Sequence, residues 1–187
     1  LNSNTKYVIL NIANEWYGSW NGSGWAEGYK SAIKSLRNAG INNMLMVDCA
    51  GWGQYPDSIK YNGKEVFNAD SQRNTVFSIH MYEYAGGDST TVKTNIDNAL
   101  SIGVPVVIGE FGAQHTNGDV DEQTILNYCA QKGVGYLGWS WKGNGSGLEY
   151  LDISNTWDGS SLTDWGNTLF YGTNGIKSTA SVCSVYG

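Results

Sequence analysis

Five apolar segments recur along the chain at a nearly constant spacing, and this spacing constrains the fold more than any other feature. They lie at residues 7–16, 43–50, 75–84, 105–111 and 135–141, so successive segments begin 30 to 36 residues apart. The first, YVILNIANEW, is typical of a strand that is buried on both faces. The spacing is that of successive βα units, which build parallel sheets with right-handed crossovers.

Helical patterns fill the intervals between these segments. Ser23 is expected to cap the first helix, whose apolar residues recur every three or four positions until Gly40 stops it. The helix after the fourth strand is expected to begin at Asp119 and to end before Gly133. The remaining helices are expected at Lys64–Asn68, Thr90–Ile102 and Thr163–Tyr171.

Two architectures share this alternation of strands and helices. A doubly wound nucleotide-binding sheet is usually marked by a glycine-rich phosphate loop after an early strand, and no such loop follows the early strands here. The other architecture is the (β/α)₈ TIM barrel, whose active site gathers at the carboxyl ends of its strands. The alternation therefore favours an α/β barrel.

The composition excludes some classes of partner. The formal net charge is −6 and only 11 residues are Lys or Arg, which argues against a nucleic-acid-binding surface. No apolar run approaches the roughly 18 residues that a membrane span needs, so no membrane partner is expected. The chain contains 8 Trp, 12 Tyr and 4 Phe. So many aromatic rings in an acidic, weakly charged chain suit a surface that stacks on neutral sugars, or alternatively a Trp-rich core.

The three cysteines, Cys49, Cys129 and Cys183, form neither a C-x-x-C pair nor a cluster with histidine. This arrangement argues against zinc and redox sites. We expect the cysteines to be small buried hydrophobic residues, with one optional disulfide. No cofactor and no catalytic metal are expected, and a structural cation is left open.

Polar residues stand where the expected strands end. A carboxylate at the end of an apolar strand is costly to bury unless it has a partner or a function. A single such glutamate could belong to a structural ion pair, but two converging at a barrel mouth are the equipment for glycoside hydrolysis. The four strand ends read Asn14-Glu15-Trp16, His80-Met81-Tyr82, Gly109-Glu110-Phe111 and Trp139-Ser140-Trp141.

Several strings resemble glycoside hydrolase family 5. ILNIANEW, FSIHMYEY, VVIGEFG and LGWSW look like the fourth, sixth, seventh and eighth barrel strands of that family. MVDCAGWGQYP, YAGGD and LTDWGN look like its bacterial endo-β-1,4-mannanases. The resemblance covers essentially the whole chain. It implies strands 4–8 of a TIM barrel, and a retaining enzyme that hydrolyses internal bonds of β-mannan.

The resemblance also implies roles for two glutamates. Glu15 matches the general acid/base, and Glu110 matches the nucleophile that forms a covalent glycosyl-enzyme intermediate. Such a retaining mechanism requires the two carboxyl groups to lie about 5–5.5 Å apart. Glu15 must be protonated when it meets the glycosidic oxygen, while Glu110 must be ionised.

Further residues match substrate-binding positions of the family. Asn14 matches the residue that hydrogen-bonds the sugar 2-OH, and it can share the site with Glu15 only where the strand ends or bulges. His80 and Tyr82 are two residues apart, on one face of a strand, and such a Tyr donates a hydrogen bond to the nucleophile. His80 could instead be a satisfied polar group inside the barrel. The remaining candidates are Trp139 as the sugar platform, Trp16, Trp20, Trp52 and Trp141 as subsite or structural residues, and Gln114 and His115 at the cleft edge.

The sequence departs from the family in one respect. The family's first three strands, including an Arg that supports the nucleophile, have no counterpart in this chain. We therefore expect residues 1–187 to be a single catalytic domain that is incomplete at its N-terminus. A secreted protein, monomeric once the barrel is complete, is also expected. The alternatives are a β-1,4-glucanase of the same family, a non-catalytic sugar-binding module and an inactive barrel fragment.

Overall fold

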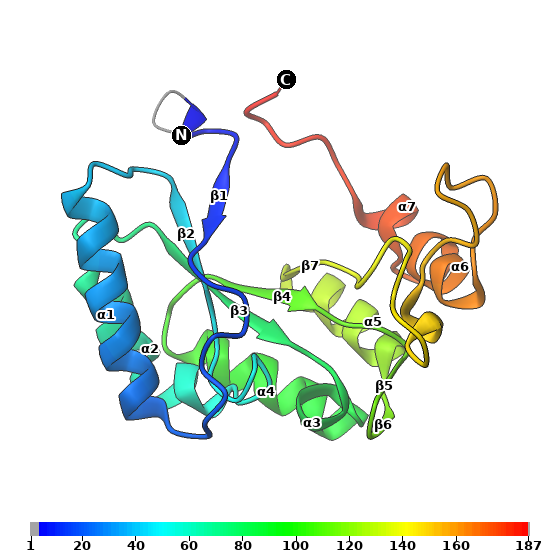
Figure 1. Ribbon diagram of the computed structural model, residues 1–187, viewed down its shortest axis with the longest axis horizontal. Helices are drawn as coiled ribbons and strands as arrows, with labels where there is room; N and C mark the ends of the chain where they lie inside the picture. Colours follow the sequence, from blue (N-terminus) through cyan, green and yellow to red (C-terminus); the bar gives the residue numbers. More distant parts are fainter. Residues whose placement is uncertain (1–3, 187) are drawn as a thin grey trace. The chain divides into compact units, whose positions relative to one another are not determined.

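The structure is a computed structural model that describes residues 4–186 (Figure 1). Its chain divides into two compact units. Unit 1 extends to His80 and adds Thr94–Val107 and the residues from Ser184 onward. Unit 2 contains Met81–Lys93 and Ile108–Cys183.

Unit 1 is built from alternating parallel strands and helices, as the spacing of the apolar segments predicts. Strands β1 (Ile9–Asn11), β2 (Met44–Asp48) and β3 (Thr75–His80) are hydrogen-bonded in that order, and both pairings are parallel. Helices α1 (Gly22–Asn38) and α2 (Asp57–Ala69) connect them and lie side by side (Figure 1). Helix α4 (Ser89–Ser101) belongs to unit 1 from Thr94 onward.

The core of unit 1 lies between these helices and the strands. Trp25 and Ile33 of α1, Leu45 of β2 and Phe77 of β3 are all fully buried. The Trp25 indole also donates a hydrogen bond of 2.8 Å to the backbone carbonyl of Asp48, which ties α1 to the carboxyl end of β2. The position of this strand end is therefore fixed by the core.

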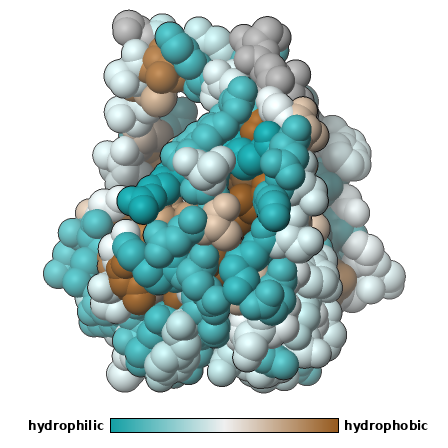
Figure 2. Space-filling model, turned by 90° about the vertical axis from the view of Figure 1, so that its left-hand side faces the viewer, coloured by the Kyte–Doolittle hydropathy of each residue, from teal (hydrophilic) through white to brown (hydrophobic). Residues whose placement is uncertain are grey.

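The outer face over α1 is mostly hydrophilic, and its hydrophobic residues are scattered among polar ones (Figure 2). Such scattered apolar residues are normal on the surface of a globular protein. Among the residues that the structure describes, none of the helices has the length and apolarity to cross a membrane.

Unit 2 contains the end of β4 (Val106–Glu110), its neighbour β7 (Gly135–Tyr136), and an antiparallel hairpin of β5 (Gln114–His115) and β6 (Gly118–Asp119). Phe111 and Trp165 pack edge to face within it, with ring centroids 5.2 Å apart. Its helical segments are α3 (Glu83–Gly86), α5 (Glu122–Lys132), η2 (Glu149–Leu151), α6 (Asp164–Tyr171) and α7 (Ile176–Thr179).

The strands are shorter than the apolar segments predict. β1 ends at Asn11, and the prediction that it is buried on both faces is wrong, because Ile9 is 54% exposed and β1 is the first strand in the hydrogen-bonded order. β3 stops at His80, since Tyr82 already caps helix α3. β7 stops at Tyr136, although the chain still follows its neighbour, because the Leu137 N–H donates to the Ile108 carbonyl.

Three helix starts also differ from the prediction. The N-cap of α1 is Asn21 rather than Ser23, because the Asn21 side-chain oxygen accepts hydrogen bonds from two backbone N–H groups of the first turn. α5 is capped by Asp121, and Asp119 lies in β6 instead. α2 is 13 residues long and far exceeds the predicted Lys64–Asn68.

Two predicted helix stops are confirmed. Gly40 and Gly133 both follow helix ends with positive φ angles of 79° and 68°. The run Gly133–Gly138 has the spacing G-x-G-x-x-G, but it leaves a helix and enters β7, whereas a phosphate loop leaves a strand and opens a helix.

The cysteines are free thiols in the structure. Cys49 and Cys129 are buried, as predicted for small hydrophobic residues. For Cys183 that prediction is wrong, because it lies exposed near the end of the chain.

Candidate active site

Glu15 lies in a turn just after β1. Its backbone has a φ angle of 48°, in the left-handed region that a non-glycine residue seldom adopts. The Glu15 N–H donates a hydrogen bond of 3.0 Å to Oδ2 of Asp48, and this bond holds the turn. Neighbouring side chains of a regular strand point to opposite faces of the sheet, but β1 has already ended at Asn11. The side chains of Asn14 and Glu15 are therefore not required to point in opposite directions, as a shared site needs.

The Glu15 side chain meets His80, which ends β3. The distance from His80 Nδ1 to Glu15 Oε1 is 2.6 Å. The His80 side chain is only 2% exposed, whereas that of Glu15 is 30% exposed. Glu15 therefore reaches solvent on one side and is held by a buried imidazole on the other.

Asp48, the last residue of β2, completes this cluster in unit 1. It is 1% exposed, and its Oδ1 accepts a hydrogen bond of 2.9 Å from the Asn11 side chain and lies 3.5 Å from His80 Nε2. Burial opposes ionisation of Asp48, but the contacts with His80, the Glu15 N–H and Asn11 outweigh it and lower the pKa of this carboxyl. Asp48 is thus an ionised, buried partner of Glu15 and His80.

Glu110 ends β4 and belongs to unit 2. The Tyr82 hydroxyl donates a hydrogen bond of 2.9 Å to Glu110 Oε2, which is the contact that the sequence predicts for this pair. Tyr82 is 4% exposed, so the hydroxyl is held in place by its surroundings. A hydrogen bond to a carboxylate favours its ionised form, which is the form that a nucleophile needs.

The ring of Tyr82 is packed against His115 of the β5–β6 hairpin. The two rings stack with centroids 4.3 Å apart and an angle of 23° between their planes. His115 Nδ1 lies 2.7 Å from Oε2 of Glu83, whose side chain is only 8% exposed. His115, which the sequence suggests only as a cleft-edge residue, therefore supports the tyrosine that contacts Glu110.

The other candidates of unit 1 are exposed. Asn14 is exposed, and Trp16 and Trp52 are 46% and 59% exposed. The Trp16 ring packs edge-on against the rings of Tyr17 and Tyr29, which are 5.0 and 5.6 Å away. Rings held in this way still present surface on which a sugar can stack.

The other candidates of unit 2 have similar surroundings. Trp139 and Trp141 are 43% and 41% exposed, and Gln114 is exposed in β5. The Trp139 carbonyl accepts a hydrogen bond from the Trp165 indole, and the Trp141 indole donates to the Trp157 carbonyl. These bonds fix both tryptophan segments while leaving part of each indole open.

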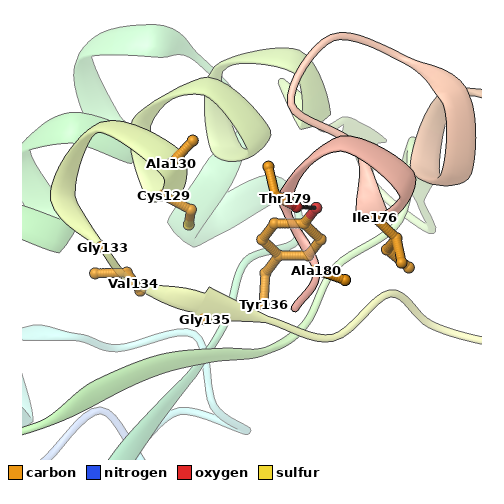
Figure 3. A pocket seen from close by; sticks show the side chains of 9 residues that line it. All are labelled: Cys129, Ala130, Gly133, Val134, Gly135, Tyr136, Ile176, Thr179 and Ala180. Carbon is orange, nitrogen blue, oxygen red and sulfur yellow. Dashed lines mark hydrogen bonds between the residues drawn. The ribbon is translucent and has the colours of Figure 1, made fainter. Parts of the chain in front are cut away.

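A separate pocket of about 560 Å³ lies in unit 2 between α5, β7 and α7 (Figure 3). Small and apolar residues dominate its lining, and the Tyr136 hydroxyl beside it is bonded to the Asn174 carbonyl and Thr179. Its lining includes none of the predicted site residues, so the pocket is distinct from the candidate active site.

A match to a family profile shows which family this chain belongs to. The profile of the cellulase family, glycosyl hydrolase family 5, matches residues 1–145. The chain belongs to glycosyl hydrolase family 5. The matched residues include Glu15, Glu110 and Trp139, so the family 5 resemblance drawn from the sequence is confirmed for the part of the chain that carries the candidate site.

Relatives with similar sequences are longer than this chain. A mannan endo-1,4-β-mannosidase of Salipaludibacillus agaradhaerens is 58% identical, over 96% of this chain and 58% of its own length. One from Streptomyces lividans is 47% identical, over 97% of this chain and 47% of its own length. A β-mannanase/endoglucanase A of Caldicellulosiruptor saccharolyticus is 43% identical, over 97% of this chain and 13% of its own length. The chain thus spans less than two thirds of each of these proteins.

Solved family 5 structures establish the fold. The β-mannanase from Thermomonospora fusca superposes with a TM-score of 0.94 at 40% identity, and the match covers 100% of this chain and 63% of that one. Its mannohexaose complex gives a TM-score of 0.91. The fold is that of the TIM-barrel β-mannanases, and this chain corresponds to part of the barrel.

Proposed function

We propose that the protein is a retaining endo-β-1,4-mannanase that cleaves internal bonds of mannan, glucomannan and galactomannan. The observation that carries this proposal is the 58% identity, over 96% of the chain, to a mannan endo-1,4-β-mannosidase. By comparison, two proteins named as cellulase or endoglucanase alone are 26% identical, over 73% and 71% of this chain. The carboxyl groups of Glu15 and Glu110 are the groups that we propose to carry out the reaction.

In the first step, Glu110 acts as the nucleophile and Glu15 as the general acid. A Glu110 carboxylate oxygen bonds to the anomeric carbon while the bond from that carbon to the glycosidic oxygen breaks. The glycosidic oxygen takes the bonding electron pair and the proton of the Glu15 carboxyl. The products are a glycosyl-enzyme and the released half of the polysaccharide.

In the second step, Glu15 acts as the general base. It removes a proton from water while the water oxygen bonds to the anomeric carbon and the bond to Glu110 breaks. Glu110 leaves as a carboxylate, which the Tyr82 hydroxyl stabilises, and Glu15 is protonated again. Two displacements at one carbon retain its configuration.

The remaining candidates bind the sugar chain in this proposal. Asn14 hydrogen-bonds the 2-OH, and Trp139 is the platform for the sugar at the cleavage point. Trp16 and Trp52 line neighbouring subsites, which their open ring surfaces support. His80 is too buried to be a platform, and its contact with Glu15 supports a role in holding that residue instead.

One observation favours a second function, a β-1,4-glucanase activity. A relative that is 43% identical over 97% of this chain is named β-mannanase/endoglucanase, so the name of one related protein joins two activities. Glucose and mannose differ only at C2, where Asn14 is proposed to contact the hydroxyl. We therefore propose glucan hydrolysis as the alternative activity.

Hydrolysis of mannan and of carboxymethylcellulose by the intact protein tests the choice between the two substrates. Faster release of reducing sugar from mannan is expected, and faster release from carboxymethylcellulose would favour the glucanase. Glu110→Gln is expected to abolish either activity, whereas Glu149→Gln, at an exposed glutamate of the same unit, is expected to preserve it. Full activity of Glu110→Gln would contradict the mechanism.

The setting in which the protein works is also a proposal. A polysaccharide is too large to enter a cell, which supports a secreted protein, and a complete barrel has no open sheet edge, which supports a monomer. The prediction of three further βα units ahead of Leu1 stays a prediction. The mass of the protein recovered from culture supernatant tests secretion and the length of the intact chain, and a protein retained in the cell would refute secretion. Light scattering tests the oligomeric state, and a dimer would refute the monomer.

A further inference from the structure

A single buried carboxylate contacts the proposed acid/base residue in two ways. Oδ2 of Asp48 accepts a hydrogen bond of 3.0 Å from the Glu15 backbone N–H. Oδ1 of Asp48 faces Nε2 of His80 at 3.5 Å, and the opposite nitrogen of that ring lies 2.6 Å from the Glu15 carboxyl. The main chain and the side chain of Glu15 are thus both tied to Asp48.

Both oxygens of Asp48 face hydrogen-bond donors. Oδ2 faces the Glu15 N–H, and Oδ1 faces the Asn11 amide and His80 Nε2. A carboxylate can accept all of these contacts, whereas an asparagine in either orientation would place its NH₂ group against another donor. The surroundings of residue 48 therefore require an acid, although Asp48 is only 1% exposed and cannot reach a substrate itself.

The same geometry fixes the hydrogens on His80. An ionised Asp48 has no proton to give, so the ring is stable there only with hydrogen on Nε2. His80 Nδ1 then points at Glu15 Oε1, and the short contact between them holds one proton. With the proton on the Glu15 oxygen, Glu15 is the acid; moving it to Nδ1 gives a carboxylate and an imidazolium, with no other bond changed.

We infer that Asp48 is a positioning residue that fixes the left-handed turn of Glu15 and keeps hydrogen on His80 Nε2, so that His80 Nδ1 shares the proton of Glu15. Its effect on catalysis rests on the proposed function, whereas the state of the His80 ring does not. An aspartate sets the tautomer and orientation of a histidine in the same way in serine proteases.

Kinetics of Asp48→Asn test the catalytic part. We expect kcat on mannan to fall about 10- to 100-fold, the loss expected for removing one hydrogen bond to a charged group. KM is expected to stay within about twofold, because Asp48 does not touch the sugar. Asp70→Asn is the matched control, since Asp70 is also a buried carboxylate of unit 1 but is bonded to Arg37, and its kcat is expected to be unchanged. A folded Asp48→Asn protein with wild-type kcat would overturn the inference.

Nitrogen NMR of the histidine rings tests the structural part without any activity. A His80→Gln variant assigns the His80 signals in the intact protein, because those are the signals that it removes. In the unsubstituted protein at neutral pH, His80 Nε2 is expected to show the shift of a protonated nitrogen. An unprotonated Nε2 would overturn the inference even if Asp48→Asn failed to fold. Should mannan hydrolysis be absent altogether, a protonated Nε2 would still support the Asp48–His80–Glu15 contact, so the two failures are distinguishable.

Discussion

Replacing Tyr82 by phenylalanine removes one hydroxyl and leaves the ring in place. That hydroxyl donates a hydrogen bond of 2.9 Å to Glu110, and the ring remains stacked on His115. Because Tyr82 is 4% exposed, water cannot readily replace the lost donor. The substitution therefore isolates a single hydrogen bond to the proposed nucleophile.

The expected size of the effect follows from that bond. A hydrogen bond to a charged group contributes about 1.5–3 kcal/mol. Since each 1.36 kcal/mol corresponds to a tenfold change in rate, the loss amounts to about 10- to 150-fold. It should fall mainly on the second step, because Glu110 leaves as a carboxylate there and no longer has the hydroxyl to stabilise it.

Stopped-flow hydrolysis of a β-mannoside with a chromogenic leaving group separates the two steps in the intact protein. The Tyr82→Phe variant is expected to show a burst of leaving group followed by slow turnover, with a lower KM because the glycosyl-enzyme accumulates. Tyr171→Phe, at a tyrosine of unit 2 that is 65% exposed, is the control and is expected to behave as wild type. An unchanged kcat for Tyr82→Phe would refute the role of this hydrogen bond.

Three further predictions concern the framework. Arg37→Met leaves the buried Asp70 carboxylate without its charged partner and is expected to lower the free energy of unfolding by about 3–5 kcal/mol in urea denaturation. Burial opposes ionisation of Asp70, but the hydrogen bonds that its carboxylate accepts, those from Arg37 foremost, together outweigh burial and lower its pKa. Below about pH 4 the unfolded chain therefore binds more protons than the folded protein. As the pH decreases, the free energy of unfolding should fall by up to about 1.4 kcal/mol per pH unit, and Asp70→Asn should reduce this slope. A thiol reagent at neutral pH should label Cys183 in the folded protein, and Cys49 and Cys129 only after unfolding, because burial raises the pKa of Cys129 to about 12.

The order of elements could be predicted from the sequence, but their ends could not. Apolar spacing identifies the strands and helices because burial imposes it on the sequence. The segment 75–84 is expected to be one strand, yet β3 stops at His80 because the chain turns into α3 there. Likewise Asn21, rather than Ser23, caps α1, and both residue types are equally good caps by composition alone.

The candidate site, too, could be predicted from the sequence only in part. Glu15, Glu110 and the contact between Tyr82 and Glu110 could be anticipated, because they stand at strand ends and match a family motif. Asp48 was missed as a site residue, although an acid at the end of the apolar run NMLMVD was a visible signal. Its partner Glu15 is 33 residues away in the sequence, and only the pairing of β1 with β2 brings them together.

The central claim is that Glu110 forms a covalent bond to mannose during hydrolysis. Incubating the intact protein with a 2-deoxy-2-fluoro-β-mannosyl fluoride, which slows the second step, and mapping the modified peptide by mass spectrometry tests it directly. The mechanism predicts one added sugar on the peptide that contains Glu110, and none on the Glu110→Gln variant. A sugar attached to another residue, or turnover that inverts the anomeric carbon without any covalent adduct, would contradict it.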